Sequence, residues 1–542
     1  MQVLLTAFGA KHIHKTLAPW YLKAYCDIHV PACDIVVQEH NINDAPGDIV
    51  SQIYLGKPDV VGFSCYIWNV ELVVKIAAML KQVLPNCVII LGGPEVSFEA
   101  DCGAYPFANY IVQGAGEMTF AKVLREILDG NVSHGQIRGA GEGMDFAELP
   151  SPYTAAYYDS FREGRMGAME HQLVYYESSR GCPFSCAYCL SSADCGVMEL
   201  PLERVFSEIG GLLAQGARCI KFVDRTFNAN QWRAVEIFRH ILSLDTDCTF
   251  HFEVAADLFH PEMLEVVSLM PRQRVQFEIG IQSTNGETLA EIHRGMNLAL
   301  ALENIKTLVG FGNCHVHVDL IAGLPFETVD SFGRGIDQCM AVRPHMLQLG
   351  FLKLLKGTGI RENSAAYGYV WNPFPPYQVF RSDSMDFADM IQLRDIERVI
   401  NKFYNSGMFA NAIEYAIHSV FGSGYACFSK LSDFCRGMHL QVSLKEVYTI
   451  LLDFLCAHTD KAAAEHVIKL DCLTFDTKGM LPEGIIPRRD KQAEGEWKRD
   501  SLFNYRHVRV EHFDFDKKTR VFIYDEKDVI KKSHRVIEGD SL

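Results

Sequence analysis

Over residues 1–140, short apolar runs rich in valine and isoleucine alternate with longer helix-like segments. The short runs predict buried strands, and the longer segments predict helices between them. This alternation predicts a doubly wound parallel sheet of the Rossmann type, with ligand-binding loops at its carboxyl edge. The first run, in MQVLLTAFG, lacks the basic region and long apolar core of a signal peptide, so it predicts a strand. The predicted strands are residues 3–8, 34–40, 60–66, 87–93 and 110–117.

A second alternation of strands and helices runs from about residue 171 to residue 360. Its six units predict a partial (β/α)6 barrel, whose active site is expected at the carboxyl ends of the strands. Residues 141–170 show no clean periodicity, and we interpret them as a linker that packs on its neighbours. The predicted barrel strands are residues 173–179, 219–224, 249–255, 275–283, 315–323 and 346–355.

The last part of the chain, residues 361–542, has a mixed and mostly helical pattern. Residues 386–420 and 443–470 predict helices, and residues 505–525 predict strands near the end. This extension carries no motif with an assignable chemistry, and by its position we expect it to cap the barrel mouth. The fold class expected for the whole chain is therefore α/β: domain 1–140, linker 141–170, barrel 171–360 and extension 361–542.

Composition narrows the functional classes without choosing one. The net charge of -16 disfavours a nucleic-acid partner, because a polyanion binds basic surfaces. No run of about 18 apolar residues is present, which predicts a protein without a membrane span. Seventeen cysteines without a secretory signal indicate a reducing cytoplasm, where clustered thiols bind metal or take part in redox chemistry more often than they form disulfides.

Three of these cysteines, Cys182, Cys186 and Cys189, lie within eight residues in SSRGCPFSCAYCLSS. A disulfide would leave one thiol over, and zinc usually needs a second ligand pair, which nearby Cys195 alone does not supply. Three thiolates on one loop suit a four-iron cluster whose remaining iron takes an outside ligand. The spacing alone leaves coincidence open. Its position directly after the first barrel strand, at the active-site end, favours the cluster.

The loop resembles the C-x3-C-x-aromatic-C motif of the radical S-adenosylmethionine (SAM) superfamily, with Tyr188 as the aromatic residue. Further segments resemble that family in order: FVDRTFN at 222–228, EIGIQSTN at 278–285, IHRGMN at 292–297 and DLIAGLPFET at 319–328. The resemblance implies that the three cysteines hold a [4Fe–4S] cluster and that SAM chelates its open iron. The SAM-binding residues it implies are Tyr188, Asp224, Arg225, Thr226, Glu253, Gln282, Ser283, Arg294 and Gly323.

A Rossmann-like domain before such a barrel resembles the cobalamin-binding radical SAM enzymes. The resemblance rests on three strand ends, in VVGFSCYIWN, LGGPEVSF and IVQGAGE. The Asp-x-His-x-x-Gly signature is absent after the first strand, which implies cobalamin without a protein histidine on cobalt; His12 and His14 are interpreted as surface-loop residues. The implied cobalamin-binding residues are Ser64, Cys65, Tyr66, Gly92, Gly93, Pro94, Glu95, Gly114, Gly116 and Glu117.

The resemblance implies methylation of an unactivated carbon of a small molecule, with SAM cleaved to a 5′-deoxyadenosyl radical. A flavodoxin- or ferredoxin-type donor would reduce the cluster. Alternatives that stay open are a rearrangement, ring contraction or cyclisation with the same cofactors, a cobalamin sensor and a methylthiotransferase. Taken singly, the carboxylates Glu253, Glu278 and Asp319 are equally well explained as capping groups or buried ion pairs.

Overall fold

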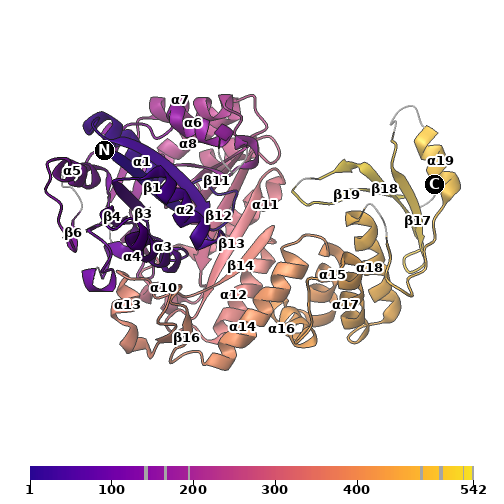
Figure 1. The fold of residues 1–542 in the computed structure, drawn as a ribbon. Helices are drawn as coiled ribbons and strands as arrows, with labels where there is room; N and C mark the ends of the chain where they lie inside the picture. The colour runs from indigo at the N-terminus through magenta and orange to yellow at the C-terminus, as the bar shows by residue number, and fades with distance from the viewer. Residues whose placement is uncertain are drawn as a thin grey trace.

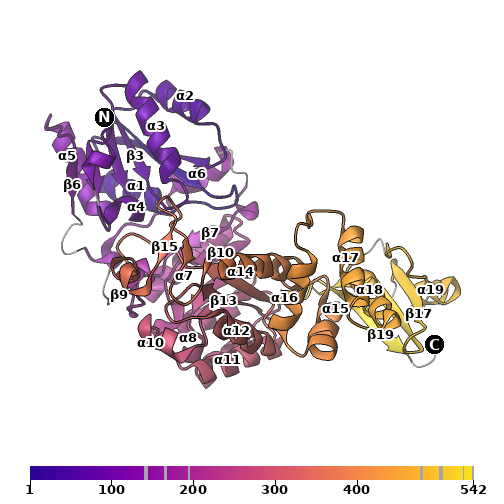
Figure 2. The same cartoon turned by 90° about the horizontal axis from the view of Figure 1, so that it is seen from below.

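The computed structural model describes residues 1–99, 101–139, 144–163, 168–192, 196–476, 480–499, 505–528 and 530–539. Its ribbon shows two α/β units side by side and a C-terminal arm that extends away from them (Figure 1). Turning the molecule shows the N-terminal unit lying over one end of the barrel (Figure 2). Among the described residues, no helix combines the length and the apolar character that crossing a bilayer requires.

The N-terminal unit is a six-stranded parallel sheet in the order β2-β1-β3-β4-β5-β6. Two apolar cores cover its faces: α2 and α3 pack on one face, and α1 and α5 pack on the other. All five predicted strands are found, and β6 is a short addition at the edge. The strands are β1 (Gln2–Gly9), β2 (Asp34–Asn41), β3 (Val60–Ser64), β4 (Val88–Gly92), β5 (Tyr110–Val112) and β6 (Gln136–Arg138). The helices are α1 (Ala18–His29), α2 (Pro46–Gly56), α3 (Val70–Val83), α4 (Pro94–Ser97) and α5 (Glu117–Leu128).

The central unit is a second parallel sheet, in the order β14-β13-β12-β11-β10-β7, with its helices on the outside. Each of the six predicted barrel strands is present. They are β7 (Val174–Tyr176), β10 (Cys219–Phe222), β11 (Thr249–Val254), β12 (Val275–Gln282), β13 (His315–Ala322) and β14 (Met346–Phe351). The helices are α7 (Leu202–Ala214), α8 (Gln231–Ser243), α9 (Pro261–Ser268), α10 (Gly286–Glu291), α11 (Leu298–Phe311) and α12 (Val329–Ala341). Between β7 and α7, the short strands β8 (Ser179–Cys182) and β9 (Gly196–Glu199) form an antiparallel ribbon.

The segment between the two units contains one helix that the sequence pattern does not predict, α6 (Ala155–Glu163). Two turns are too short for a clear period, although Tyr157 and Phe161 are buried one turn apart. The ring of Tyr157 makes an edge contact with Trp20 of α1, and the ring of Tyr153 stacks on Tyr176 of β7. Aromatic contacts therefore fasten this segment to both units.

The C-terminal region begins with a small hairpin at the barrel mouth and continues into helices that share one apolar core with the barrel. The hairpin strands are β15 (Val370–Trp371) and β16 (Val379–Arg381), preceded by α13 (Gly359–Glu362). The helices are α14 (Phe387–Val399), α15 (Ala410–Tyr415), α16 (Gly424–Phe434), α17 (Leu444–Cys456) and α18 (Lys461–Phe475). Last come α19 (Lys491–Arg499) and an antiparallel sheet of β17 (Val508–Phe513), β18 (Lys518–Lys527) and β19 (His534–Gly539).

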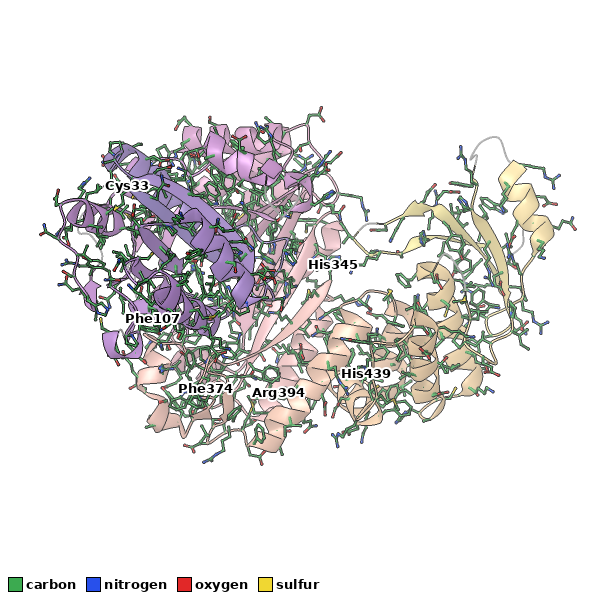
Figure 3. All side chains as sticks on the ribbon, viewed as in Figure 1. Cys33, Phe107, His345, Phe374, Arg394 and His439 are labelled. Carbon is green, nitrogen blue, oxygen red and sulfur yellow. The ribbon has the colours of Figure 1, made fainter. Side chains whose placement is uncertain are left out.

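The two ends of this extension contact opposite ends of the barrel. At the mouth, the Tyr369 hydroxyl donates a hydrogen bond to the Gly323 carbonyl (2.8 Å). At the other end, the turn after β18 brings Asp528 within 2.6 Å of Arg272, which precedes β12. His345, the residue before β14, lies on the side of the barrel that faces this turn (Figure 3). The expectation of a cap over the mouth therefore fits the first hairpin and is wrong for the terminal strands.

Candidate functional site at the barrel mouth

The cysteine loop is anchored by the β8–β9 ribbon and by backbone hydrogen bonds. Cys182 is the last residue of β8. The preceding Gly181 has φ +98°, and the Gly196 carbonyl oxygen occupies the position that a Cβ atom would take, so only glycine fits there. Within the loop, the Cys189 amide donates to the Cys186 carbonyl (3.1 Å), and Ala187 pairs with Ile292 and Ile360. Cys186 is buried, while Cys182 and Cys189 are partly exposed. Cys195 lies outside the described residues.

Asp224, at the end of β10, holds the start of this loop. Its carboxylate accepts hydrogen bonds from the Ser178 amide (3.0 Å), the Ser178 hydroxyl (2.6 Å) and the Ser179 hydroxyl (2.5 Å). Burial raises the pKa of Asp224 to about 6, against the lowering effect of these hydrogen bonds. Because both oxygens are already engaged, the geometry places Asp224 beneath the loop as an anchor. Its neighbours differ: Arg225 is exposed, and the Thr226 hydroxyl lies 3.7 Å from the Cys182 sulfur.

Arg294 and Gln282 converge on the buried cysteine from the barrel side. The Arg294 guanidinium donates to the Gly280 carbonyl (2.6 Å) and lies 3.8 Å from the Cys186 sulfur. Gln282 has φ +69° at an irregularity in the β12 register, and its amide folds over Gly280, where a Cβ would collide with it. A left-handed conformation at a residue other than glycine costs free energy and is concentrated at functional sites. Gln282 Oε1 and Arg294 Nε make no hydrogen bond within the described part of the chain.

Some of the remaining predicted SAM residues line the site, and others hold its loops in place. Ser283 is buried and its hydroxyl donates to Glu327, which ties the loop after β12 to the loop after β13. Gly323, with φ +88°, forms the wall beside Met390 of α14. Burial raises the pKa of Tyr188, whose ring lies beside Arg294 and Cys186 in the loop. Glu253 is partly exposed at the end of β11, where its carboxylate pairs with Lys221 (3.1 Å).

Below this site lies a layer of polar side chains in which the carboxylates Glu253 and Glu278 form ion pairs, the alternative that the sequence left open, with partners that the motifs did not identify. Lys221 of β10 also pairs with Glu278 of β12 (3.0 Å), and His251 of β11 lies 3.1 Å from the same carboxylate oxygen. Although burial opposes ionisation, His251 and Lys221 hold the pKa of Glu278 at about 2. The signal was present in the sequence, because polar residues occupy alternate positions of otherwise apolar strands and therefore share the inward face.

On the N-terminal unit, the predicted strand ends meet at one edge of the sheet. The Cys65 amide donates to the Gly92 carbonyl (2.7 Å), and Gly93, with φ +104°, passes so close that a Cβ would lie 2.6 Å from the Cys65 carbonyl oxygen. Pro94 then begins α4, and Gly114 (φ +65°) donates its amide to the Ser97 hydroxyl. The Ser64 hydroxyl, buried at this edge, makes no hydrogen bond among the described residues.

Two of the predicted cobalamin residues instead join the two units. Glu95 is buried, pairs with Lys356 after β14 (3.0 Å) and accepts a hydrogen bond from the Tyr377 hydroxyl. Glu117, which follows Gly116 at the start of α5, pairs with Arg180 of β8 (2.9 Å). These contacts bring the carboxyl edge of the first sheet against the mouth of the barrel.

Two further features lie near this contact between the N-terminal unit and the barrel. Tyr66 stacks on Trp68 with ring centroids 4.4 Å apart, beside a cavity of about 330 Å³ lined by Trp68, Glu71 and Lys353. His14 bonds through Nδ1 to the Tyr175 hydroxyl of β7 (2.5 Å), while His12 is exposed. The His14 contact places the loop after β1 against the first barrel strand.

The residues at both edges fit the groups that the sequence resemblance implies. Three thiols on one anchored loop leave a fourth cluster corner for another ligand, and the unsatisfied Gln282 and Arg294 atoms beside it are available to a polar ligand. On the opposing edge, close glycine turns and the unsatisfied Ser64 hydroxyl leave room for a flat ligand to approach the backbone.

Three family models match successive parts of the chain. The B12 binding domain matches residues 5–124, and the radical SAM superfamily matches residues 176–338. A family described only as a protein of unknown function, DUF4080, matches residues 365–535. The first two matches coincide with the two α/β units, and the third covers the C-terminal extension.

Individual relatives agree with this assignment. An uncharacterized methyltransferase of Pyrococcus horikoshii is 27% identical over 322 residues, which cover 54% of this chain and 68% of the relative. The cobalamin-dependent radical SAM methyltransferase TokK of Streptomyces tokunonensis is 26% identical over 343 residues, which cover 55% of this chain. The aligned part is only 47% of TokK, so the chain spans about half the length of that relative.

A solved structure shares the fold over a longer stretch. The cobalamin-dependent S-adenosylmethionine radical enzyme OxsB, with aqua-cobalamin and S-adenosylmethionine bound, matches 87% of this chain and 78% of its own with a TM-score of 0.59 at 16% identity. The first α/β unit is thus a B12 binding domain by family match, and the barrel belongs to the radical SAM superfamily.

Proposed function

We propose that this enzyme transfers a methyl group to an unactivated carbon of a small-molecule substrate. The observation that carries the proposal is the opposition of two edges, because the ion pairs of Glu95 and Glu117 hold the cobalamin-domain edge against the barrel mouth. Groups held at the two edges therefore share one space. Methyltransferases among the relatives support the same reaction class.

The proposed cofactors are cobalamin, SAM and a [4Fe–4S] cluster; when bound, they would supply a methyl group carried by cobalamin and a radical from SAM that removes a substrate hydrogen. In this proposal Cys182, Cys186 and Cys189 hold the cluster. The Arg294 guanidinium, 3.8 Å from the Cys186 sulfur, offsets thiolate charge, and Gln282 presents its free amide oxygen to SAM.

The other residues in the proposal position these groups or line the second cofactor. Asp224 and Ser283 hold the two loops, while Tyr188, Thr226 and Glu253 line the SAM site with Arg225 and Gly323. Ser64, Cys65 and Tyr66, with Gly92, Gly93, Pro94, Gly114 and Gly116, line the cobalamin edge, and Glu95 and Glu117 clamp it. A flavodoxin- or ferredoxin-type protein donates the electron.

The test uses the full chain, reconstituted anaerobically with iron, sulfide and cobalamin, and SAM with a deuterated methyl group. A metabolite extract is supplied as substrate, and the expected result is a labelled product with both S-adenosylhomocysteine and 5′-deoxyadenosine. Formation of 5′-deoxyadenosine without S-adenosylhomocysteine or label would overturn methyl transfer in favour of a rearrangement. Cys186→Ala should lose both cluster iron and 5′-deoxyadenosine. Cys427→Ala, a buried thiol of α16 outside the site, should keep both.

A further inference from the structure

A cluster of mixed nitrogen and oxygen donors lies inside the barrel, below the proposed SAM site. Donor atoms of Glu278, His317 and Asp319 all lie within 4.8 Å of one another. These residues come from neighbouring strands, since Glu278 of β12 pairs in register with His317 of β13, and Gly280 pairs with Asp319. His251 of β11 reaches the same point, with Nε2 3.1 Å from the Glu278 carboxylate. Three potential ligands thus converge from two neighbouring strands, and His251 of a third strand lies beside Glu278.

The histidine nitrogens approach these carboxylates without hydrogen-bond alignment. His317 Nε2 lies 3.0 Å from Asp319 Oδ1, yet neither atom makes a hydrogen bond among the described residues, nor does His251 Nε2. The His317 residue is only 7% exposed, so water does not satisfy it freely. Buried polar atoms in folded proteins are almost always paired, and those left unpaired point to a missing partner. Imidazole and carboxylate atoms at this separation are also close enough to serve as ligands of one shared cation.

The charged side chains around these donor atoms also favour a bound cation. Glu253, Glu278 and Asp319 bring three carboxylates into the barrel interior, and Lys221 is the ammonium that pairs with the first two. His317 in turn lies 3.0 Å from Asp319, so acidic and basic groups are packed together in this space. A divalent cation bound by Glu278, His317 and Asp319 would take the place of a proton between His317 and Asp319, because metal ligands bind in their deprotonated form.

We propose that Glu278, His317 and Asp319 bind one divalent first-row transition metal ion, separate from the iron–sulfur cluster, with His251 beside the Glu278 ligand. One imidazole and two carboxylates suit Mn²⁺, Fe²⁺ or Zn²⁺, and the set lacks the thiolates that would select softer ions. The ion cross-links β12 and β13 one layer below Gly280, whose carbonyl accepts a hydrogen bond from the Arg294 guanidinium. It therefore forms the floor of the site and has no part in cleaving SAM.

The test uses the full chain with cluster and cobalamin loaded, freed of other metals by a chelator and titrated anaerobically with Mn²⁺. Free Mn²⁺ is counted by its room-temperature EPR signal, and Zn²⁺ is then added as competitor. We expect one Mn²⁺ per chain that Zn²⁺ displaces. The isosteric changes Asp319→Asn and Glu278→Gln should each weaken binding by at least about tenfold, the scale of losing a metal-site group. His240→Gln, on outer helix α8, should leave binding unchanged.

A second variant keeps the proposal falsifiable if those proteins fold poorly. Lys221→Met removes the competing ammonium, so Mn²⁺ affinity should rise and added Mn²⁺ should raise the melting temperature of this variant. Absence of any Mn²⁺ or Zn²⁺ binding to the parent protein, or binding indifferent to both Asp319→Asn and Glu278→Gln, would overturn the metal site. A Lys221→Met protein whose melting temperature ignores Mn²⁺ would also count against it.

Discussion

At the scale of single residues, a few glycines cannot be replaced by any other residue, because another segment of backbone lies where a side chain would begin. Gly93 combines φ +104° with a Cβ position 2.6 Å from the Cys65 carbonyl oxygen. Gly181 is constrained in the same way against Gly196, at the entrance to the cysteine loop. Both glycines lie at an edge that the proposed function uses, so their conformational freedom serves to shape the two cofactor sites.

Gly93→Ala should therefore damage the cobalamin edge. The left-handed conformation alone costs about 1–3 kcal/mol, and the clash forces the Cys65 turn to move. Urea denaturation should show the lost stability, and absorbance should show weaker cobalamin binding. The matched control is Gly210→Ala in α7, where a Cβ meets nothing within 4 Å and helix propensity predicts a gain of roughly 0.5–1 kcal/mol. Equal behaviour of the two variants would contradict the constraint.

At the scale of elements, buried carboxylates connect helices and loops that are distant in sequence. Asp471 of α18 accepts hydrogen bonds from the backbone amides of Asn411 (3.0 Å) and Ala412 (2.9 Å) at the start of α15. It thus caps a helix from another element, as Asp224 anchors the cysteine loop from β10. Burial is the largest influence on Asp471 and raises its pKa to about 7.

This shift predicts a pH dependence of stability with a defined sign. The pKa of Asp471 is higher in the folded state than its ordinary value of 3.8, so its contribution is complete at low pH and is lost as pH rises through about 7. Between these values the free energy of unfolding should fall by about 1.4 kcal/mol per pH unit from this group. Asp471→Asn, neutral throughout, should lack this component when urea midpoints are compared from pH 4.5 to 7.5. Parallel curves for the two proteins would disprove the shift.

At the scale of the whole molecule, the extension links the two ends of the barrel. Its helices merge with the barrel core, whereas the terminal sheet has small cores of its own and extends to the far side (Figures 1 and 2). The Asp528 carboxylate accepts hydrogen bonds from the backbone amides of Ile530 and Lys531 after β18. The same carboxylate forms an ion pair with Arg272 on the barrel. The terminal sheet is thus fastened away from the proposed chemistry.

Weakening this contact should loosen the terminal sheet without affecting SAM cleavage. Arg272→Ala removes one partly exposed ion pair, worth about 0–1 kcal/mol, whereas Asp528→Ala also removes the bonds that hold the turn. Hydrogen exchange in β18 and β19 should accelerate modestly in the first variant and more strongly in the second. Formation of 5′-deoxyadenosine should stay within about twofold of the parent in both, as expected for a change away from the mouth. A large loss in Arg272→Ala would show that the terminal sheet acts on the active site.

The amino-acid sequence alone determined the order of units and most strands, because buried parallel strands between helices leave a strong pattern of apolar runs. It also located the cysteine loop and the glycine-rich strand ends, since these chemistries need particular residues at close spacing. The tertiary structure decided which side chains form contacts between segments that are distant in sequence. Only folding shows that Glu95 and Glu117 clamp two units and that Asp224 supports a loop.

The polar barrel interior is among the features that only the tertiary structure decided, and the reason is physical. Lys221, His251 and His317 lie on different strands, separated in sequence by whole helices, and each is unremarkable beside its own neighbours. Closing the sheet turns alternate positions inward and brings them within ion-pair distance. The sequence by itself determined which strands and loops would form, and tertiary structure decided which side chains would meet, because meeting depends on register and curvature rather than on spacing along the chain.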